Sequence, residues 1–481
     1  MRGCTQAPDA GPARPRVSAR EHGAVGDGQT LDTAALQRTL DAAAACAGVA
    51  LLPPGTYLSG ALFLHSGVTL ELQRGATLLG SQRLADYPLR PTRVAGIEMV
   101  WPAALLNIYE QAHVALIGEG CIDGDGKVFW DSYWALRQRY EPLGLRWASD
   151  YDAQRPRLIQ VYGSRQVFIG GGLLLRRAGF WGLHLCYSEQ VTVDGLVVRN
   201  NGDAQGEGDA RGPSTDGIDI DSSRDILIQH ADIAANDDAI VFKAGRDADG
   251  LRVARPTEQV LVRDCVVREG AAGVSFGSET AGGFRDIIVQ GLRVLAPVPV
   301  GVLFKSTPTR GGFGERITLR DIQLQDVGVA LRVSMNWNPA YSQAHIPDAL
   351  PPGLAEPPSY WAVLAQPVPL AQGLTHWREV RIEGLRARGA ERAFEVHAHA
   401  QAPLQRFSLA DLDIQARQGG YLYGSQDWRF ERCRLSLPPG QAVALPGPEA
   451  APGLDPALTR LQAQLALPDP ARLSYEEQDK A

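Results

Sequence analysis

One short pattern of polar and apolar residues recurs along most of the chain. A polar pair precedes alternating apolar residues, as in Arg165-Gln166-Val167-Phe168-Ile169 and Glu189-Gln190-Val191-Thr192-Val193. Further copies begin at residues 67, 111, 224, 258, 285, 315, 378 and 405. Between Val167 and Ile317 the steps are 24, 35, 34, 27 and 30 residues. Such short strands at this period predict an all-β solenoid of stacked coils, in which the variable steps are loops on one edge. We see no helical pattern between the strands, which argues against an α/β sheet.

The two ends of the chain differ from this repeat. Residues 31–47 are Ala-rich, with Leu36 and Leu40 four residues apart, and we predict a helix there that begins after Asp32 and caps the first coil. Residues 1–17 are interpreted as a flexible lead-in, and 441–481 as a Pro-rich linker and tail. The predicted solenoid therefore occupies residues 18–440.

Two long interruptions, 134–155 and 334–376, are predicted to be loops. The second carries the aromatic residues Trp337, Tyr341, Tyr360 and Trp361. Two interpretations stay open: the loop packs on the outer wall, or its aromatic faces stack on sugar rings and shape a binding site.

The composition describes a soluble globular protein with little affinity for nucleic acid. The chain has 481 residues, 44% of them hydrophobic, and a net charge of −7, whereas a nucleic-acid surface requires a basic face. No apolar run approaches the length of about 18 residues that a membrane span needs. Six cysteines without zinc spacing are interpreted as mainly buried free thiols, so we expect neither a metal nor another cofactor. The segment around Cys4 resembles the end of a bacterial lipoprotein signal, which would place a lipid anchor there; an ordinary disordered start is the alternative.

Two acidic clusters stand out within the repeat. They are Ser214-Thr215-Asp216-Gly217 and Asn236-Asp237-Asp238-Ala239, and a short apolar strand pattern follows each. Asp216 and Asp238 are 22 residues apart, so one coil would bring them side by side. Asp237 and Asp238 can both face one groove only if they lie in a turn before the strand, because consecutive strand residues point to opposite faces. A solvated turn is the alternative for an Asp-Asp pair, whereas three gathered carboxylates are suited to hydrolysis of a glycosidic bond.

These motifs resemble those of the family 28 glycoside hydrolases, the polygalacturonase and rhamnogalacturonan hydrolase group. Ser214-Thr215-Asp216 is similar to the family's Asn-Thr-Asp motif, and Asn236-Asp237-Asp238 to its Gly-Asp-Asp motif. The opening from Glu21 to Gly28 is similar to the cap of pectin-active β-helices. The resemblance implies a right-handed parallel β-helix over about residues 18–440. It also implies inverting hydrolysis, with Asp237 as the general acid and Asp216 and Asp238 activating the water.

Two departures from the family motifs bear on specificity. Ala271-Ala272-Gly273 stands where the family has Gly-His-Gly, and Leu303-Phe304-Lys305 where it has Arg-Ile-Lys. The lost histidine and arginine weigh against a plain endo-polygalacturonase and favour exo-acting or rhamnogalacturonan-directed members. The segment from Glu279 to Gly283 resembles the bacterial branch.

A galacturonate substrate carries a carboxylate, so the groove should hold cations despite the acidic chain. Lys305 lies at a position matched by the family motif, and Lys243 follows the acid pair. Arg246, Arg310 and His184 are further candidates for substrate binding. A solvated surface charge for each arginine, and a structural role for the histidine, are the alternatives.

The leading hypothesis is a secreted or periplasmic bacterial hydrolase that cleaves galacturonate-containing pectin, acting from chain ends. A rhamnogalacturonan I hydrolase of the same family is the close alternative. A calcium-dependent pectate lyase and a non-catalytic pectin-binding β-helix are more distant alternatives.

Overall fold

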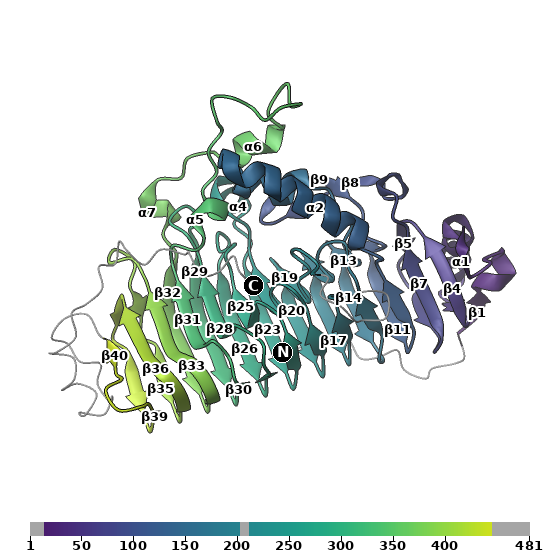
Figure 1. The fold of residues 1–481 in the computed structure, drawn as a ribbon. Helices are drawn as coiled ribbons and strands as arrows, with labels where there is room; N and C mark the ends of the chain where they lie inside the picture. Colours follow the sequence, from purple (N-terminus) through teal and green to yellow (C-terminus); the bar gives the residue numbers. More distant parts are fainter. Residues whose placement is uncertain (1–13, 203–210, 445–481) are drawn as a thin grey trace.

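The computed structural model describes residues 14–202 and 211–444, and shows one elongated stack of parallel coils. Each coil contributes a strand to each of three walls, and strands of successive coils pair in parallel (Figure 1). This arrangement confirms the predicted parallel β-helix.

The recurring sequence pattern forms one continuous wall. The second residue of the polar pair has a positive φ in copy after copy, for example 55° at Gln190, 54° at Asp225 and 56° at Gln259. A single residue in this left-handed conformation turns the chain sharply before the apolar residues begin, and polar residues tolerate it better than β-branched ones. The wall consists of β1 (Arg16–Ser18), β3 (Val49–Leu52), β6 (Thr69–Leu72), β11 (Ala112–Gly118), β14 (Arg165–Gly170), β17 (Glu189–Asp194), β20 (Arg224–Gln229), β23 (Thr257–Arg263), β26 (Phe284–Gln290), β29 (Phe313–Arg320), β32 (His376–Glu383), β34 (Leu404–Gln405), β35 (Ser408–Ala410), β37 (Ser425–Gln426) and β38 (Arg429–Glu431).

A second wall precedes the first in each coil and carries the polar clusters on its outer face. Its inward side chains stack from coil to coil: the rings of Phe242, Phe276 and Phe304 lie nearly parallel, with centroids 4.6 and 4.7 Å apart. Stacked rows of this kind pack the interior closely. We call this wall the floor; it consists of β5 (Leu62–Leu64), β10 (Leu106–Tyr109), β13 (Ile159–Tyr162), β16 (Leu183–Cys186), β19 (Ile218–Asp221), β22 (Ile240–Lys243), β25 (Ala272–Phe276), β28 (Val300–Lys305), β31 (Val329–Ser334), β33 (Arg386–His397), β36 (Asp413–Tyr423) and β40 (Val443–Ala444).

The third wall closes each coil with the shortest strands. The long strands β33 and β36 bend from this wall into the floor, which joins the two walls into one sheet. The other members are β2 (Asp27–Leu31), β4 (Gly55–Ser59), β7 (Ala76–Gly80), β12 (Cys121–Asp123), β15 (Leu174–Arg176), β18 (Val197–Arg199), β21 (Asp232–Ala234), β24 (Val266–Glu269), β27 (Arg293–Val294), β30 (Gln323–Gln325) and β39 (Arg434–Ser436).

The predicted helix covers the first coil. It is α1 (Thr33–Ala45), and it buries Leu36 and Leu40 on the end of the stack. Asp32 precedes its first residue as predicted, but its side chain does not cap the helix. The carboxylate accepts hydrogen bonds from the backbone N–H groups of Val25 and Gly26 instead, which ties the preceding loop to the helix.

The prediction that no helix interrupts the strands was wrong. Between β12 and β13 lie α2 (Lys127–Tyr140), η3 (Glu141–Leu143), η4 (Arg146–Ala148) and α3 (Ser149–Asp152), where part of the chain was expected to be a loop. Further helices are η1 (Ala19–His22), η2 (Leu84–Asp86), α4 (Asp247–Val253), α5 (Pro339–Ser342), α6 (Ser359–Leu364) and α7 (Leu370–Gly373). The repeat hid them because they are insertions outside the coils.

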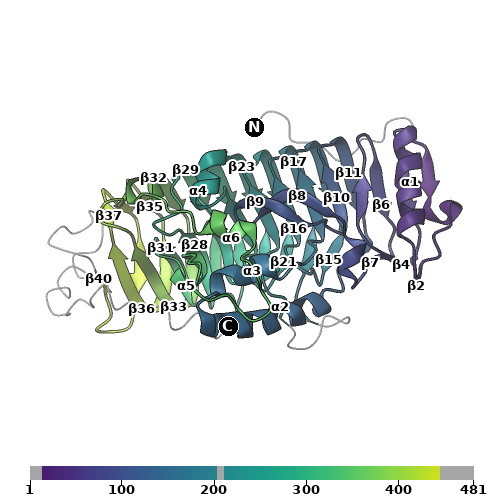
Figure 2. The same ribbon diagram turned by 90° about the horizontal axis from the view of Figure 1, so that it is seen from above.

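The insertions gather above the floor as a roof, which we define as residues 127–152 and 335–364 (Figure 2). Its two halves meet at Asp152, whose carboxylate accepts hydrogen bonds from Tyr360 Oη at 2.6 Å and Trp361 Nε1 at 3.1 Å. Trp361 is fully buried and lies edge-on to Trp147, with centroids 5.0 Å apart. The segment 334–376 therefore packs by its later part, whereas its first residues reach the site described below.

The boundaries differ slightly from the predicted ones. β1 begins at Arg16, inside the predicted lead-in, because it pairs with β3, and β40 lies inside the predicted tail. Cys4 lies outside the described residues. Of the described cysteines, Cys186 and Cys265 are buried as expected, whereas Cys46 is exposed. In the described part of the chain no helix is both long and apolar enough to cross a membrane.

Candidate active site

The two acidic clusters occupy equivalent turns on neighbouring coils. β19 and β22 pair in register, with Ile218 opposite Ile240, so Asp216 and Asp238 each lie two residues before a paired position. The N–H of Gly217 donates to the carbonyl of Asp238 at 2.9 Å, which extends the pairing into the turns. Asp237 lies in a bend ahead of β22, as its predicted access to the groove required. The register thus brings the acids together.

All three carboxylates line one cavity of about 130 Å³ between the floor and the roof. The floor and its turns contribute acids and lysines, and the roof contributes an arginine and aromatic residues. The lining residues are Ala95, Arg146, Asp150, Phe180, Trp181, Ser214, Asp216, Asp237, Asp238, Lys243, Ser278, Glu279, Lys305, Trp337, Asn338 and Tyr341.

Asp238 accepts hydrogen bonds from two neighbours on later coils. Lys305 Nζ donates to Oδ2 at 2.7 Å, and Ser275 Oγ donates to Oδ1 at 2.6 Å. Both partners come from the floor, since Ser275 lies on β25 and Lys305 ends β28. Charge-assisted hydrogen bonds of this kind fix the orientation of a carboxylate.

Lys243 sits among three other carboxylates. Its Nζ lies 3.3 Å from Asp216 Oδ2, 3.5 Å from Asp219 Oδ1 and 3.7 Å from Glu279 Oε2. The ammonium also lies 4.9 Å from the centre of the Trp181 ring. One cation therefore balances part of a cluster of buried negative charge.

Burial and mutual repulsion shift these acids toward the protonated form. Burial, followed by the charge of Asp219, raises the pKa of Asp216 well above its usual range. Burial and the charge of Asp238 raise the pKa of Asp237. Burial also raises the pKa of Asp219 to about 7, although Lys243 opposes this shift. The site can therefore keep a carboxylic acid protonated in mildly acidic solution, which is what donation to a leaving oxygen requires.

The two departures from the family motifs form one apolar patch. Ala272 and Leu303 cluster with Val300, and the Trp337 ring packs against them. Lys305 Nζ lies 4.9 Å from the centre of that ring. The positions that carry a histidine and an arginine in the family motifs thus support an aromatic wall of the cavity in this chain.

Arg246 and Arg310, predicted to bind substrate, do not line the cavity. Both are fully buried and share Asp247: Arg246 Nε lies 2.7 Å from Oδ2, and Arg310 Nη1 lies 2.6 Å from Oδ1. Arg246 also donates to Tyr151 Oη and to the carbonyl of Ser342, which link two roof segments. We therefore correct the expected direct contact, because their guanidinium groups are engaged in holding the roof.

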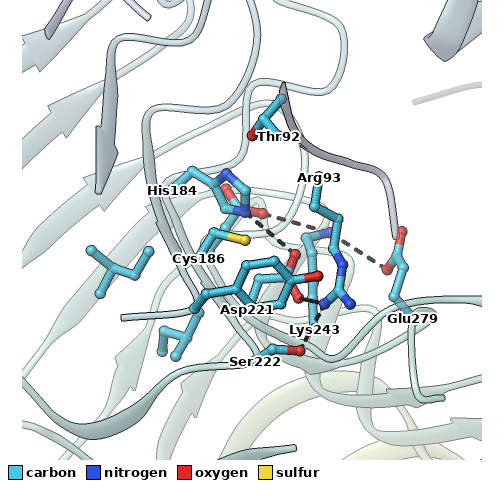
Figure 3. A network of polar contacts seen from close by, with 12 residues as sticks. Thr92, Arg93, His184, Cys186, Asp221, Ser222, Lys243 and Glu279 are labelled. Carbon is cyan, nitrogen blue, oxygen red and sulfur yellow. Dashed lines mark hydrogen bonds and ion pairs between the residues drawn. The ribbon is translucent and has the colours of Figure 1, made fainter. Parts of the chain in front are cut away.

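His184 does not line the cavity, and Figure 3 shows it beside Cys186 and Asp221. It is fully buried, its Nε2 lies 3.4 Å from Asp221 Oδ2, and burial lowers its pKa to about 4. The ring packs edge-on against Trp181, with centroids 4.8 Å apart. The placement favours the structural alternative, in which His184 supports a residue of the cavity wall.

His184, Cys186 and Asp221 also offer three atoms within 4.8 Å of one another, a spacing that metal sites use. The donor set does not suit a cation, because Arg93 Nη1 already lies 2.8 Å from Asp221 Oδ1. A metal ion there would face a buried guanidinium, and burial raises the pKa of the Cys186 thiol well above its usual range. We assign no metal to this group.

Sequence reasoning missed several residues of the cavity. Arg146, Glu279 and Asp219 were not singled out as site residues, yet the first two line the cavity and the third contacts Lys243, which also lines it. Asp219 could have been predicted from the sequence. It alternates with Ile218 and Ile220, which face the core, and alternate residues of a strand face opposite sides. Arg146 had no signal, because its position depends on how the roof folds back.

The hairpin formed by β8 (Leu89–Val94) and β9 (Ile97–Pro102) covers the floor on the N-terminal side of the acids (Figure 2). Arg93 donates to Asp221 on β19, Thr92 Oγ1 accepts a hydrogen bond from Gln160 on β13, and Tyr109 Oη donates to the carbonyl of Pro91 at 2.7 Å. On the other side of the acids the floor continues over β31 and β33, where Arg332, Glu395 and His397 are only half-buried. The hairpin therefore covers the floor on the N-terminal side of the acids, whereas floor residues on the C-terminal side are partly exposed.

Known proteins resemble this chain in sequence and in fold. It is 27% identical over 349 residues to an exo-poly-alpha-D-galacturonosidase of Dickeya chrysanthemi, with 65% of this chain and 55% of that protein covered. It is 28% identical over 353 residues to a probable polygalacturonase of Vitis vinifera, with 70% and 67% covered. The chain thus spans just over half the length of the Dickeya enzyme.

Its fold is similar to that of an exopolygalacturonase of Thermotoga maritima, with a TM-score of 0.69, 23% identity, and 93% of this chain and 94% of that chain covered. Residues 16–72 match the model of the rhamnogalacturonase A/epimerase, pectate lyase-like family. Residues 99–347, about half of the chain, match the model of the glycosyl hydrolases family 28. These residues include the three acids and the cavity, and the chain therefore belongs to glycoside hydrolase family 28.

Proposed function

We propose that this glycosidase is an inverting hydrolase of galacturonate-containing pectic chains that acts from a chain end. The observation that carries the exo assignment is the hairpin β8–β9, which covers the floor beside the acids. A chain threaded through the site would have to occupy the space that the hairpin fills. A chain end can enter instead from the side of β31 and β33. The similarity to enzymes named for exo action supports the same assignment.

The geometry supports a division of roles among the three acids. Lys305 and Ser275 both donate hydrogen bonds to Asp238, an arrangement that suits a base. Asp237 is the most accessible of the three, being only half-buried, and its raised pKa suits an acid. In the proposed step, Asp216 and Asp238 orient a water, and Asp238 takes its proton as the water oxygen attacks the anomeric carbon. The glycosidic C–O bond breaks, and Asp237 gives its proton to the leaving oxygen.

The substrate is proposed to be a pectic oligosaccharide or polysaccharide met outside the cytoplasm, in the periplasm or after secretion. Trp337 offers a sugar-stacking face, and Lys305 offers positive charge beside it. The proposed hydrolysis step and the proposed binding of the substrate both use side chains alone, without a metal.

The test is digestion of polygalacturonate and of rhamnogalacturonan I oligosaccharides side by side, with products sized over time. We expect monogalacturonate or digalacturonate from polygalacturonate at the earliest times, and proton NMR should show the inverted anomer first. A ladder of intermediate lengths would contradict exo action. Release only from the rhamnose-containing chain would replace the substrate assignment, and no release from either would contradict the proposed function.

A further inference from the structure

The cations that line the cavity differ in how far the protein's own carboxylates neutralise them. Three lining residues are cationic: Arg146, Lys243 and Lys305. Lys243 lies within 3.7 Å of three carboxylates, and Lys305 is bonded to Asp238. The two lysines are therefore already paired with the acids of the site.

Arg146 shares its counter-ion with a second arginine. Its Nη1 lies 2.9 Å from Asp150 Oδ2, but Arg155 Nη2 lies 3.1 Å from the other oxygen of the same carboxylate. Arg155 is fully buried, so water does not screen its charge. Two guanidinium groups thus share one carboxylate, which leaves this cluster with a surplus positive charge. The Nε of Arg146 is buried and has no hydrogen-bond partner among the described residues.

The position of Arg146 is fixed from three sides. It begins η4 in the first half of the roof, and its guanidinium lies 5.2 Å from the centre of the Tyr341 ring in the second half. Asp150 also accepts a hydrogen bond from Ser214 Oγ at 2.7 Å, two residues before Asp216. A chain of contacts therefore connects Arg146 to the turn that carries a proposed catalytic acid.

The remaining wall of the cavity is strongly acidic. Asp216, Asp237, Asp238 and Glu279 line it, so a substrate carboxylate entering here would be repelled unless a cation received it. A guanidinium offers two parallel donors that match a carboxylate, and partial exposure, 16% of the side chain, makes Arg146 reachable.

We propose that Arg146 binds the carboxylate of the galacturonate unit held in the cavity, and that it sets the preference for the free acid over its methyl ester. The inference rests on the proposed function and deepens it. Arg146 lies outside the sequence motifs of the catalytic turns. It would supply from the roof the fork-shaped cation that is lost at Leu303.

The experiment compares trigalacturonate with its fully methyl-esterified form, using the wild-type enzyme and the variants Arg146→Gln, Arg146→Lys and Arg139→Gln. Arg139 is the matched control, an exposed arginine on α2 that does not line the cavity. The readout is the ratio of kcat/KM for the acid to kcat/KM for the ester within one preparation. Incomplete folding lowers both values equally and cancels from this ratio.

We expect the wild type to prefer the acid and Arg146→Gln to lose about 10- to 100-fold of that preference, the usual scale for a charge-assisted hydrogen bond. Arg146→Lys should fall between the two, since it keeps the charge and loses the fork, and Arg139→Gln should match the wild type. An unchanged ratio in Arg146→Gln, or equal losses on both substrates, would overturn the inference while leaving the proposed function standing. A wild type that hydrolyses neither substrate would overturn both.

Discussion

Arg93 Nη1 donates to Asp221 Oδ1 over 2.8 Å, although 128 residues separate the two and neither side chain is exposed. Arg93 belongs to the hairpin β8–β9, and Asp221 ends the floor strand β19; Figure 3 shows the contact between the two side chains. Ser222 Oγ accepts a second bond from the same nitrogen at 2.7 Å, and the guanidinium lies 4.6 Å from the centre of the Tyr187 ring. The pair fastens the hairpin to the floor.

Removing one partner of this pair should destabilise the protein strongly. We expect Arg93→Met to lower the free energy of unfolding by about 3–5 kcal/mol, because it leaves the Asp221 carboxylate buried without its cation. The double variant Arg93→Met/Asp221→Leu should recover part of the loss. Urea unfolding checks both, and Arg432→Met, which breaks the exposed pair with Asp411, should change it by less than about 1 kcal/mol. Equal costs for the buried and the exposed pair would contradict this account.

Asp219 should make stability depend on pH near neutrality. Its folded pKa of about 7 lies above that of an unfolded aspartate, about 3.9, so its protonated form favours folding at low pH. This contribution is complete below about pH 4 and is lost as the pH rises to about 7. We expect Asp219→Asn to melt increasingly above the wild type as the pH is raised from 5 to 8. A constant difference in melting temperature across that range would exclude the proposed titration.

Asp237→Asn should lower kcat on oligogalacturonates at least about 100-fold, the usual scale for loss of a general acid. The loss should be much smaller on an aryl galacturonide, since its phenolate leaves without a proton. Asp131→Asn, an exposed site on α2, is the control for a lost carboxylate. Equal losses on both substrates would remove Asp237 from the role of acid and leave it a role in binding or charge.

Trp337 should contribute to binding more than to chemistry. We expect Trp337→Ala to raise KM several-fold, because a favourable aromatic contact is worth about 1 kcal/mol, while kcat changes less. Trp337→Phe should retain most of the affinity, and Trp134→Ala on the exposed face of α2 should have no effect. A fall in kcat with constant KM would instead indicate that Trp337 acts by positioning Lys305.

Local patterns in the chain were enough to predict the coils. Each copy of the repeat combines a polar pair that tolerates a turn with apolar residues that face the interior, so every copy forms its strand for the same local reason. The acidic clusters were predictable too, since they lie at equivalent distances before the strands β19 and β22, whose pairing follows from the repeat.

The roof and the hairpin depend on contacts between segments far apart in the chain. The same contacts decide which carboxylate each cation pairs with. In the sequence, Arg246 and Arg310 were candidates for substrate binding just as Lys243 and Lys305 were. In the fold, both arginines form buried ion pairs with Asp247. Arg146 reaches the cavity because α2 and α3 fold back over the floor and meet α6 at Asp152. The free energy of burying a charge depends on which partner the fold brings within about 4 Å, and a linear pattern of residues carries no such distance.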